Sequence, residues 1–187
     1  MLNELKSALG GKKINWLAIT LILLGIAMRL LPHPPNFAPI AAVGIFSGVY
    51  FTNKKYAFIL PLAAMLISDT IIGFAEIWIT LAVYGSFAIA GLIGLWLKNN
   101  KNLTNTIGAS LLASSVFFVI TNFVVWIATP WYTKDVAGLV QCFFLAIPFF
   151  KNTLLGDLFY VGILFGVYEL VIYFIKKRKL NYQGTRY

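Results

Sequence analysis

The chain has 187 residues, of which 60% are hydrophobic and only 11% are charged. This balance lies outside the range of ordinary soluble domains and is typical of a polytopic membrane protein. The net charge of +9 does not indicate a nucleic-acid interface, because the basic residues fall in short clusters between apolar runs, as topology signals do. A lone cysteine, Cys142, excludes an intramolecular disulfide and gives no spacing of a metal site.

Apolar runs separated by short polar links predict an all-α fold, a bundle of six transmembrane helices. We expect a cytoplasmic tail over 1–13, a single six-helix transmembrane domain over 14–175, and a basic cytoplasmic tail over 176–187. The first run is interpreted as a retained helix rather than a signal peptide, because it is long, ends in Arg29 and lacks an A-x-A cleavage site. The predicted spans are 14–31, 40–52, 56–73, 77–97, 106–128 and 152–175.

Residues 136–150 are apolar but too short to span the membrane comfortably, and Pro148 stands near their end. They are interpreted as a short additional interfacial or lid helix on the outer side, or as the bent entry to the last span.

The stretch from Arg29 to Phe51, RLLPHPPNFAPIAAVGIFSGVYF, organises the chain. Its prolines predict a stiff, non-helical crossing over Pro32–Pro39 that carries the only histidine. The run 40–52 covers only about 20 Å of a hydrocarbon core of about 30 Å. The crossing can therefore dip below the membrane surface, where such backbone must face protein or a wet cavity.

Basic residues predict the orientation, because cytoplasmic loops carry an excess of lysine and arginine. Six spans place both termini on one side, and twelve of the 15 basic residues fall there; the other three are Arg29, Lys134 and Lys151. The protein is therefore expected in the cell (inner) membrane with both termini cytoplasmic. The twelve are Lys6, Lys12, Lys13, Lys54, Lys55, Lys98, Lys101, Lys176, Lys177, Arg178, Lys179 and Arg186.

In this topology most polar residues within or beside the spans share the outer end, which predicts one polar pocket open to the outside. Glu169 is the exception and is expected to pair with a basic residue at the cytoplasmic face. Trp126 and Tyr132 can stack on a ring of the ligand or serve only as aromatic-belt residues. The candidate substrate-binding residues are Arg29, His33, Asn36, Asp69, Asn122, Trp126, Tyr132, Asn152 and Asp157.

Structural roles compete with ligand binding at several of these positions. Arg29 can snorkel to the interface or pair with Asp69, and Asn122 can bond across helices. Asp157 can cap a helix or pair with Lys151 or Lys134. Two other functions stay open: a membrane-embedded enzyme, for example a lipid hydrolase with His33 and Asp69 as an acid/base pair, and a scaffold whose polar residues only join helices.

Four segments carry a resemblance: RLLPHPPNFAPIAAVGIFSG, PLAAMLISD, FFVITNFVVW and AIPFFKNTLLGDLFY. Together they resemble a bacterial family of small membrane proteins of unassigned function, itself similar to the substrate-binding (S) components of energy-coupling-factor (ECF) vitamin transporters. The resemblance covers Arg29 to Phe165. It implies six helices, cytoplasmic termini, an outward-facing pocket for a vitamin-like small molecule, and a coupling subunit with two ATPases as partner.

Two departures concern partners and chemistry. The first span lacks the AxxxA face with which S components often dock; Ala38 and Ala42 have that spacing at the start of the second span. The small residues Ala38, Ala42, Gly44 and Gly48 are therefore expected to form the partner-packing surface. Some corrinoid-binding relatives place a cysteine on cobalt, and Cys142 is the only candidate here. No nucleotide-binding motif is present, and neither catalysis, a cofactor nor a metal is expected.

Overall fold

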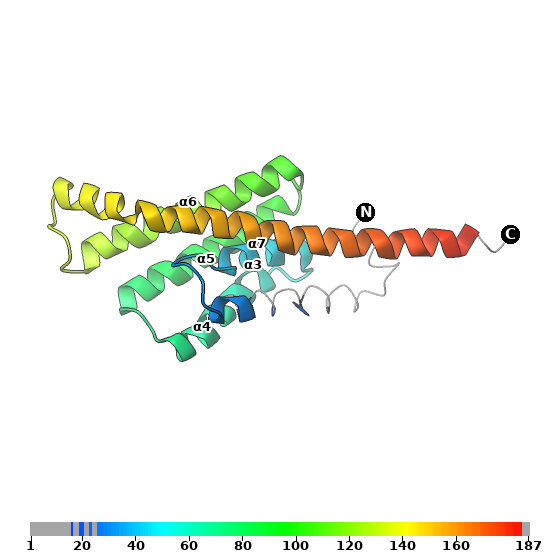
Figure 1. The fold of residues 1–187 in the computed structure, drawn as a ribbon, viewed down its shortest axis with the longest axis horizontal. Coiled ribbons are helices and arrows are strands. Elements are labelled where there is room, and N and C mark those ends of the chain that lie inside the picture. The colour runs from blue at the N-terminus through cyan, green and yellow to red at the C-terminus, as the bar shows by residue number, and fades with distance from the viewer. Residues whose placement is uncertain (1–15, 17–18, 21–22, 24–25, 185–187) are drawn as a thin grey trace.

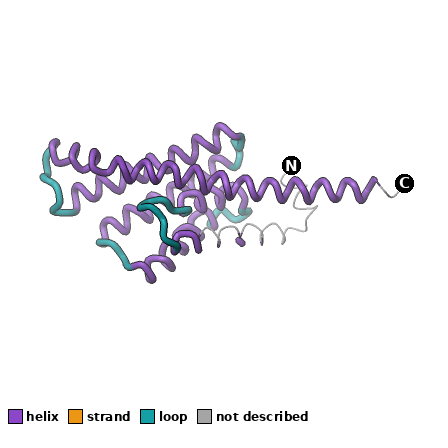
Figure 2. Tube along the Cα trace, in the orientation of Figure 1, coloured by secondary structure: helices purple, strands orange, loops and turns teal. Residues whose placement is uncertain are grey.

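The computed structural model describes residues 16, 19, 20, 23 and 26–184, and these residues form helices and loops without strands (Figures 1 and 2). The prediction of an all-α fold is confirmed for this part of the chain. The predicted tail 1–13, part of the first span (14, 15, 17, 18, 21, 22, 24 and 25) and residues 185–187 lie outside the described residues. The helices are α3 (Ile40–Tyr50), α4 (Tyr56–Ile72), α5 (Ile77–Leu97), α6 (Leu103–Ala128) and α7 (Val136–Gly184). Residues 26–30 are also helical.

Helix boundaries follow the polar links of the sequence. The bounds of α5 match the predicted 77–97, and α4 ends at Ile72, followed by Gly73 with a φ of 106°. Helix α6 begins at Leu103 rather than at 106, because the side chain of Asn102 caps it. The Asn102 Oδ1 accepts a hydrogen bond of 2.7 Å from the backbone N–H of Asn105, which satisfies one free donor of the first turn.

The prediction of a separate interfacial helix over 136–150 is wrong. Helix α7 runs without interruption through Pro148 and has 49 residues, a length of about 73 Å. A proline inside a helix removes one backbone hydrogen bond, but packing on both of its sides holds this helix together. The ring of Phe118 on α6 lies 5.4 Å from that of Phe143 and 4.4 Å from that of Phe150. Residues 136–150 therefore form the outer part of a hairpin with α6.

The core lies around α3, whose 11 residues are all buried. Helix α3 crosses α5 so closely that only glycine fits: a Cβ added at Gly48 would lie 2.6 Å from the backbone of Gly94 and Leu95. A Cβ added at Gly44 would lie 3.3 Å from the backbone nitrogen of Gly91.

This packing corrects the predicted partner surface. Ala42, Gly44 and Gly48 are buried inside the bundle, and Ala38 is half-buried and lines a cavity. Gly44 and Gly48 thus serve the α3–α5 contact inside the bundle rather than an exposed surface.

Three helices, α5, α6 and the 136–178 part of α7, are long and apolar enough to span a membrane, as in an integral membrane protein. Helices α3 and α4 are shorter apolar helices. The α3–α4 and α5–α6 turns lie toward the end of the bundle from which the C-terminal part of α7 projects (Figure 1). The α4–α5 link and the α6–α7 turn lie toward the opposite end, where the α6–α7 hairpin extends beyond the other helices.

Candidate functional site

Residues 31–39 are non-helical, as the prolines predict, and two of them contact α7. The ring of Phe37 lies 5.5 Å from that of Tyr160 in an edge-to-face arrangement. The Asn152 Nδ2 donates a hydrogen bond of 3.1 Å to the backbone oxygen of Pro35. Asn152, predicted to bind substrate, thus tethers the crossing, which in turn forms one wall of a cavity.

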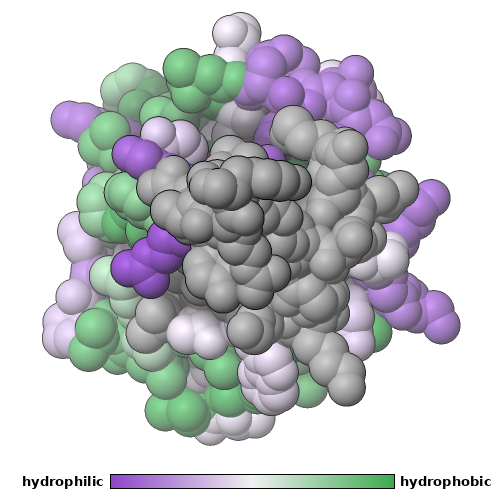
Figure 3. Space-filling view, turned by 90° about the vertical axis from the view of Figure 1, so that its right-hand side faces the viewer, coloured by the Kyte–Doolittle hydropathy of each residue, from purple (hydrophilic) through white to green (hydrophobic). Residues whose placement is uncertain are grey.

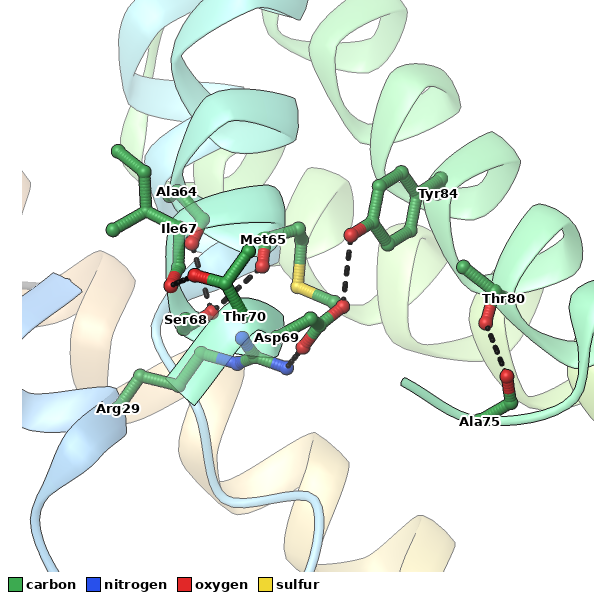
Figure 4. Close-up of polar contacts among 10 residues, drawn as sticks. All are labelled: Arg29, Ala64, Met65, Ile67, Ser68, Asp69, Thr70, Ala75, Thr80 and Tyr84. Carbon is green, nitrogen blue, oxygen red and sulfur yellow. Dashed lines mark hydrogen bonds and ion pairs between the residues drawn. The ribbon is translucent and has the colours of Figure 1, made fainter. Parts of the chain in front are cut away.

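A partly buried polar network joins the segment before the crossing to α4 and α5 (Figure 4). The Arg29 Nη2 lies 2.9 Å from the Asp69 Oδ1, and the Tyr84 hydroxyl donates a hydrogen bond of 2.8 Å to the Asp69 Oδ2. The side chains of Arg29 and Asp69 are only 15% and 11% exposed. Of the two interpretations left open by the sequence, the structure shows the pairing of Arg29 with Asp69. The Arg29 Nη1 is buried and has no hydrogen-bond partner among the described residues.

Arg29 lines a cavity of about 230 Å³. Asp157 of α7 also lines it; this residue is only 3% exposed, and its Oδ2 accepts a hydrogen bond of 2.6 Å from the Ser114 hydroxyl. The cavity thus brings a guanidinium with a free N–H and a nearly buried carboxyl into one small space. Its lining comprises Arg29, His33, Asn36, Ala38, Met65, Val83, Phe87, Phe117, Thr153 and Asp157.

His33 and Asn36 are exposed residues of the crossing that line the same cavity. Asn36 has a φ of 63°, a left-handed conformation that asparagine tolerates better than most residues. The structure therefore brings together four predicted substrate-binding residues: Arg29, His33, Asn36 and Asp157. Asp69 stands behind Arg29 as its partner.

A second cavity of about 230 Å³ adjoins the first and shares four lining residues with it: Asn36, Val83, Phe117 and Thr153. It continues along α6 past Asn122 to Val125 between mostly apolar walls. The Asn122 Nδ2 donates to the backbone oxygen of Phe118 within its own helix. Asn122 thus belongs to an outer, more apolar cavity, separate from the charged group.

The depth of the charged group differs from the prediction of a pocket at the outer end. Ser114, which bonds Asp157, stands near the middle of α6, and Phe117 lines the same cavity as Arg29. The sequence indicated such a depth for one run only, since 40–52 is too short to cross the hydrocarbon core and lets the crossing dip below the surface. Helices α3 and α4 have only 11 and 17 residues, so the segments at their ends meet α6 about half-way along its length.

Trp126 and Tyr132 line neither of the two cavities. The Trp126 Nε1 donates a hydrogen bond of 2.9 Å to the backbone oxygen of Thr133, and the Lys134 ammonium donates to the backbone oxygen of Trp126. These contacts order the α6–α7 turn. In the same turn, hydrogen bonds from the Gly138 backbone and then from the Thr133 hydroxyl lower the pKa of Asp135 below its usual value.

Sequence reasoning missed the neutral residues of the site: Ser114, Thr153 and the aromatic wall of Phe87 and Phe117. One signal was available, since a serine in mid-helix and a threonine four residues before Asp157 are polar positions inside apolar runs. The aromatic residues carried no such signal, because phenylalanine occurs throughout the apolar runs of the sequence. Among the described residues, no three His, Cys, Asp or Glu side chains gather as a metal site requires.

The other end of the bundle is closed by a polar cluster above aromatic packing. The Tyr50 hydroxyl and the Lys101 ammonium both donate to the Glu169 Oε1. The predicted pairing of Glu169 with a basic residue is therefore confirmed. The ring of Tyr168 lies 4.2 Å from that of Tyr50 and 5.3 Å from that of Phe46. These rings are buried in the core next to the cluster.

The model of one protein family, described as a family of unknown function (DUF6580), matches residues 11–181 of the chain. No curated protein and no solved structure matches it. The expected similarity to ECF S components therefore stays a prediction.

Proposed function

Since the chain belongs to the DUF6580 family, whose function is unknown, we propose its function from the geometry of the candidate site. The protein is an integral membrane protein that binds a small polar molecule inside the bilayer. It acts as the substrate-binding component of an uptake system for a vitamin-like nutrient, similar to an ECF S component. This proposed role goes beyond the observation that three described helices are long and apolar enough to span a membrane.

One observation carries the proposal: Asp157 is only 3% exposed, yet it lines a cavity together with Arg29. Ionisable groups in hydrocarbon are costly, and where they persist they usually face a substrate path. The arrangement suits a ligand with both a hydrogen-bond acceptor or anionic group, bound by the free Arg29 N–H, and a donor or cationic group, bound by Asp157. A ring or alkyl part would lie between Phe87, Phe117 and the outer cavity.

The membrane placement follows from α6. If the Trp126 end lies outside and the Lys101 end lies in the cytoplasm, the helix centre near Ser114 lies at the bilayer midplane. A six-span topology with both termini cytoplasmic is part of this proposal. The ligand enters through the outer cavity, and the cluster of Tyr50, Lys101 and Glu169 closes the cytoplasmic side.

Release into the cell requires a change of conformation, and the chain has no nucleotide-binding motif to drive one. A coupling subunit with two ATPases therefore remains the proposed partner, docked elsewhere than on the buried Gly44 and Gly48. We assign no catalysis to the site, since both oxygens of Asp69 already bond to Arg29 and Tyr84 rather than to His33.

The test is to identify what co-purifies with the protein. Wild-type protein and the Asp157→Asn and Glu76→Gln variants are purified in mild detergent and extracted, and small molecules are compared by mass spectrometry. The asparagine of the first variant keeps the side-chain volume and can still accept from Ser114 through its remaining oxygen, so the change removes the charge and turns the other acceptor into a donor. Glu76 is an exposed carboxylate outside both cavities and serves as the matched control.

The proposal expects a compound enriched with wild type and Glu76→Gln and lost from Asp157→Asn. A compound retained equally by all three proteins, or none with wild type, would contradict it.

A further inference from the structure

A groove on the surface of the bundle lies away from the candidate site, between the start of α6 and the middle of α7. Its volume is about 400 Å³, against about 230 Å³ for the central cavity. Two features define it: a long apolar stretch and one polar end at Lys101 and Glu169. The lining residues are Lys101, Asn102, Leu103, Thr106, Ile107, Leu158, Val161, Gly162, Phe165, Gly166 and Glu169.

The groove is open because two exposed glycines form part of its wall. Gly162 and Gly166 are one turn apart on α7, and apart from the adjoining backbone of α7 and the two chain neighbours no described atom lies within 4 Å of a Cβ added at either position. Leu103, which is 78% exposed, and Ile107 flank the groove on α6. The apolar part is therefore accessible from the side of the bundle that faces lipid in the proposed topology.

The length of the groove matches one leaflet. From Leu158 to Glu169, α7 rises about 17 Å, roughly half of a hydrocarbon core of about 30 Å. Beyond Leu158 the two helices close on each other through the Ser114–Asp157 hydrogen bond. A transmembrane helix of a partner would need a matching surface across the whole core, whereas a single acyl chain needs only this half.

The polar end carries an excess of positive charge. Lys101 pairs with Glu169, and Lys176 stands seven residues after Glu169 on the same face of α7. This end of the molecule, viewed in Figure 3, displays strongly hydrophilic residues beside apolar surface. The basic residues of this end whose side chains the structure describes outnumber the single described carboxylate there, that of Glu169; they are Lys54, Lys55, Lys98, Lys101, Lys176, Lys177 and Arg178.

From these observations we propose that the groove binds one anionic phospholipid of the cytoplasmic leaflet. The acyl chain lies along Gly162 and Gly166, and the phosphate lies beside Lys101 and Lys176. Basic grooves between helices at the cytoplasmic face are suited to anionic headgroups, which a zwitterionic lipid matches less well.

The experiment is a titration of delipidated full-length protein in detergent with palmitoyl-oleoyl phosphatidylglycerol or phosphatidylcholine, followed by native mass spectrometry. Wild type is expected to bind one phosphatidylglycerol at least about fivefold more tightly than phosphatidylcholine, the effect of about one lysine near the surface. Lys176→Gln leaves the Lys101–Glu169 pair in place and is expected to lower this preference about fivefold.

Filling the groove tests the acyl-chain site. Gly166→Leu is expected to lower the affinity for phosphatidylglycerol at least about tenfold, since its side chain occupies the space of several methylene groups. Gly85→Leu is the control, because Gly85 is an exposed glycine of α5 with equally open space. Equal affinity of wild type for the two lipids would overturn the proposal. The proposal would also be overturned if Gly166→Leu bound phosphatidylglycerol as tightly as Gly85→Leu does. It would likewise be overturned if Gly166→Leu changed only the oligomeric state, from dimer to monomer, because the groove would then be the contact with a second copy of the chain.

Discussion

The ion pair of Arg29 and Asp69 gives the sharpest prediction about stability. Both side chains are largely buried, and each is the other's charge partner at 2.9 Å. Replacing Arg29 by methionine or Asp69 by leucine leaves one charge unpaired, which costs about 3–5 kcal/mol of unfolding free energy in either variant. Asp69→Leu also removes the acceptor of the Tyr84 hydroxyl, an additional loss of about 1 kcal/mol.

The double variant Arg29→Met/Asp69→Leu removes both charges, so its loss is expected to be smaller than the sum of the single losses by about 2–3 kcal/mol. Unfolding in mixed micelles with increasing sodium dodecyl sulfate, followed by tryptophan fluorescence, measures all four proteins. Tyr84→Phe is expected to cost about 1 kcal/mol, and Glu76→Gln, an exposed change, serves as the reference. Losses that add to within about 0.5 kcal/mol would refute the pairing.

Three further predictions concern packing, pH and topology. Gly48→Leu is expected to prevent folding or to lower the melting temperature strongly, because even its Cβ would lie 2.6 Å from the backbone of α5, whereas Gly85→Leu is tolerated. Asp135→Ala is expected to lower the melting temperature at neutral pH. Because the folded state lowers the pKa of Asp135, the difference in melting temperature between wild type and the variant shrinks as the pH falls through and below the usual carboxyl value of about 4. A difference that does not change with pH would contradict this expectation. In a Cys142→Ala background, Lys134→Cys is expected to react with an impermeant thiol reagent in intact cells and Asn100→Cys to resist it; the reverse pattern would reject the topology.

The sequence predicted those parts of the fold that depend on local composition. The helix bounds of α4 and α5 follow from polar links, and the non-helical crossing follows from its prolines. The pairing of Glu169 with a basic residue was predictable because Glu169 is the one acidic residue within the spans that is expected near their lysine-rich end.

Features that depend on how helices pack were not predictable in this way. Pro148 indicated a break, yet aromatic contacts with α6 hold α7 continuous. The glycines of α3 fitted a partner surface as well as an internal crossing, and only the position of α5 decides between them. The depth of Asp157 required knowing which part of α6 the short helices reach; the run 40–52 was recognisably short, but its sequence does not show where along α6 its end lies.

The central claim is that the cavity between Arg29 and Asp157 binds a small molecule. Equilibrium binding of the molecule that co-purifies, measured by isothermal titration calorimetry on ligand-depleted protein, tests it most directly. We predict that wild type binds one molecule per chain and that Glu76→Gln binds it with unchanged affinity. The affinity of Asp157→Asn is expected to be at least about tenfold weaker, which corresponds to the loss of one charge-assisted hydrogen bond. Equal affinities of wild type and Asp157→Asn would contradict the claim.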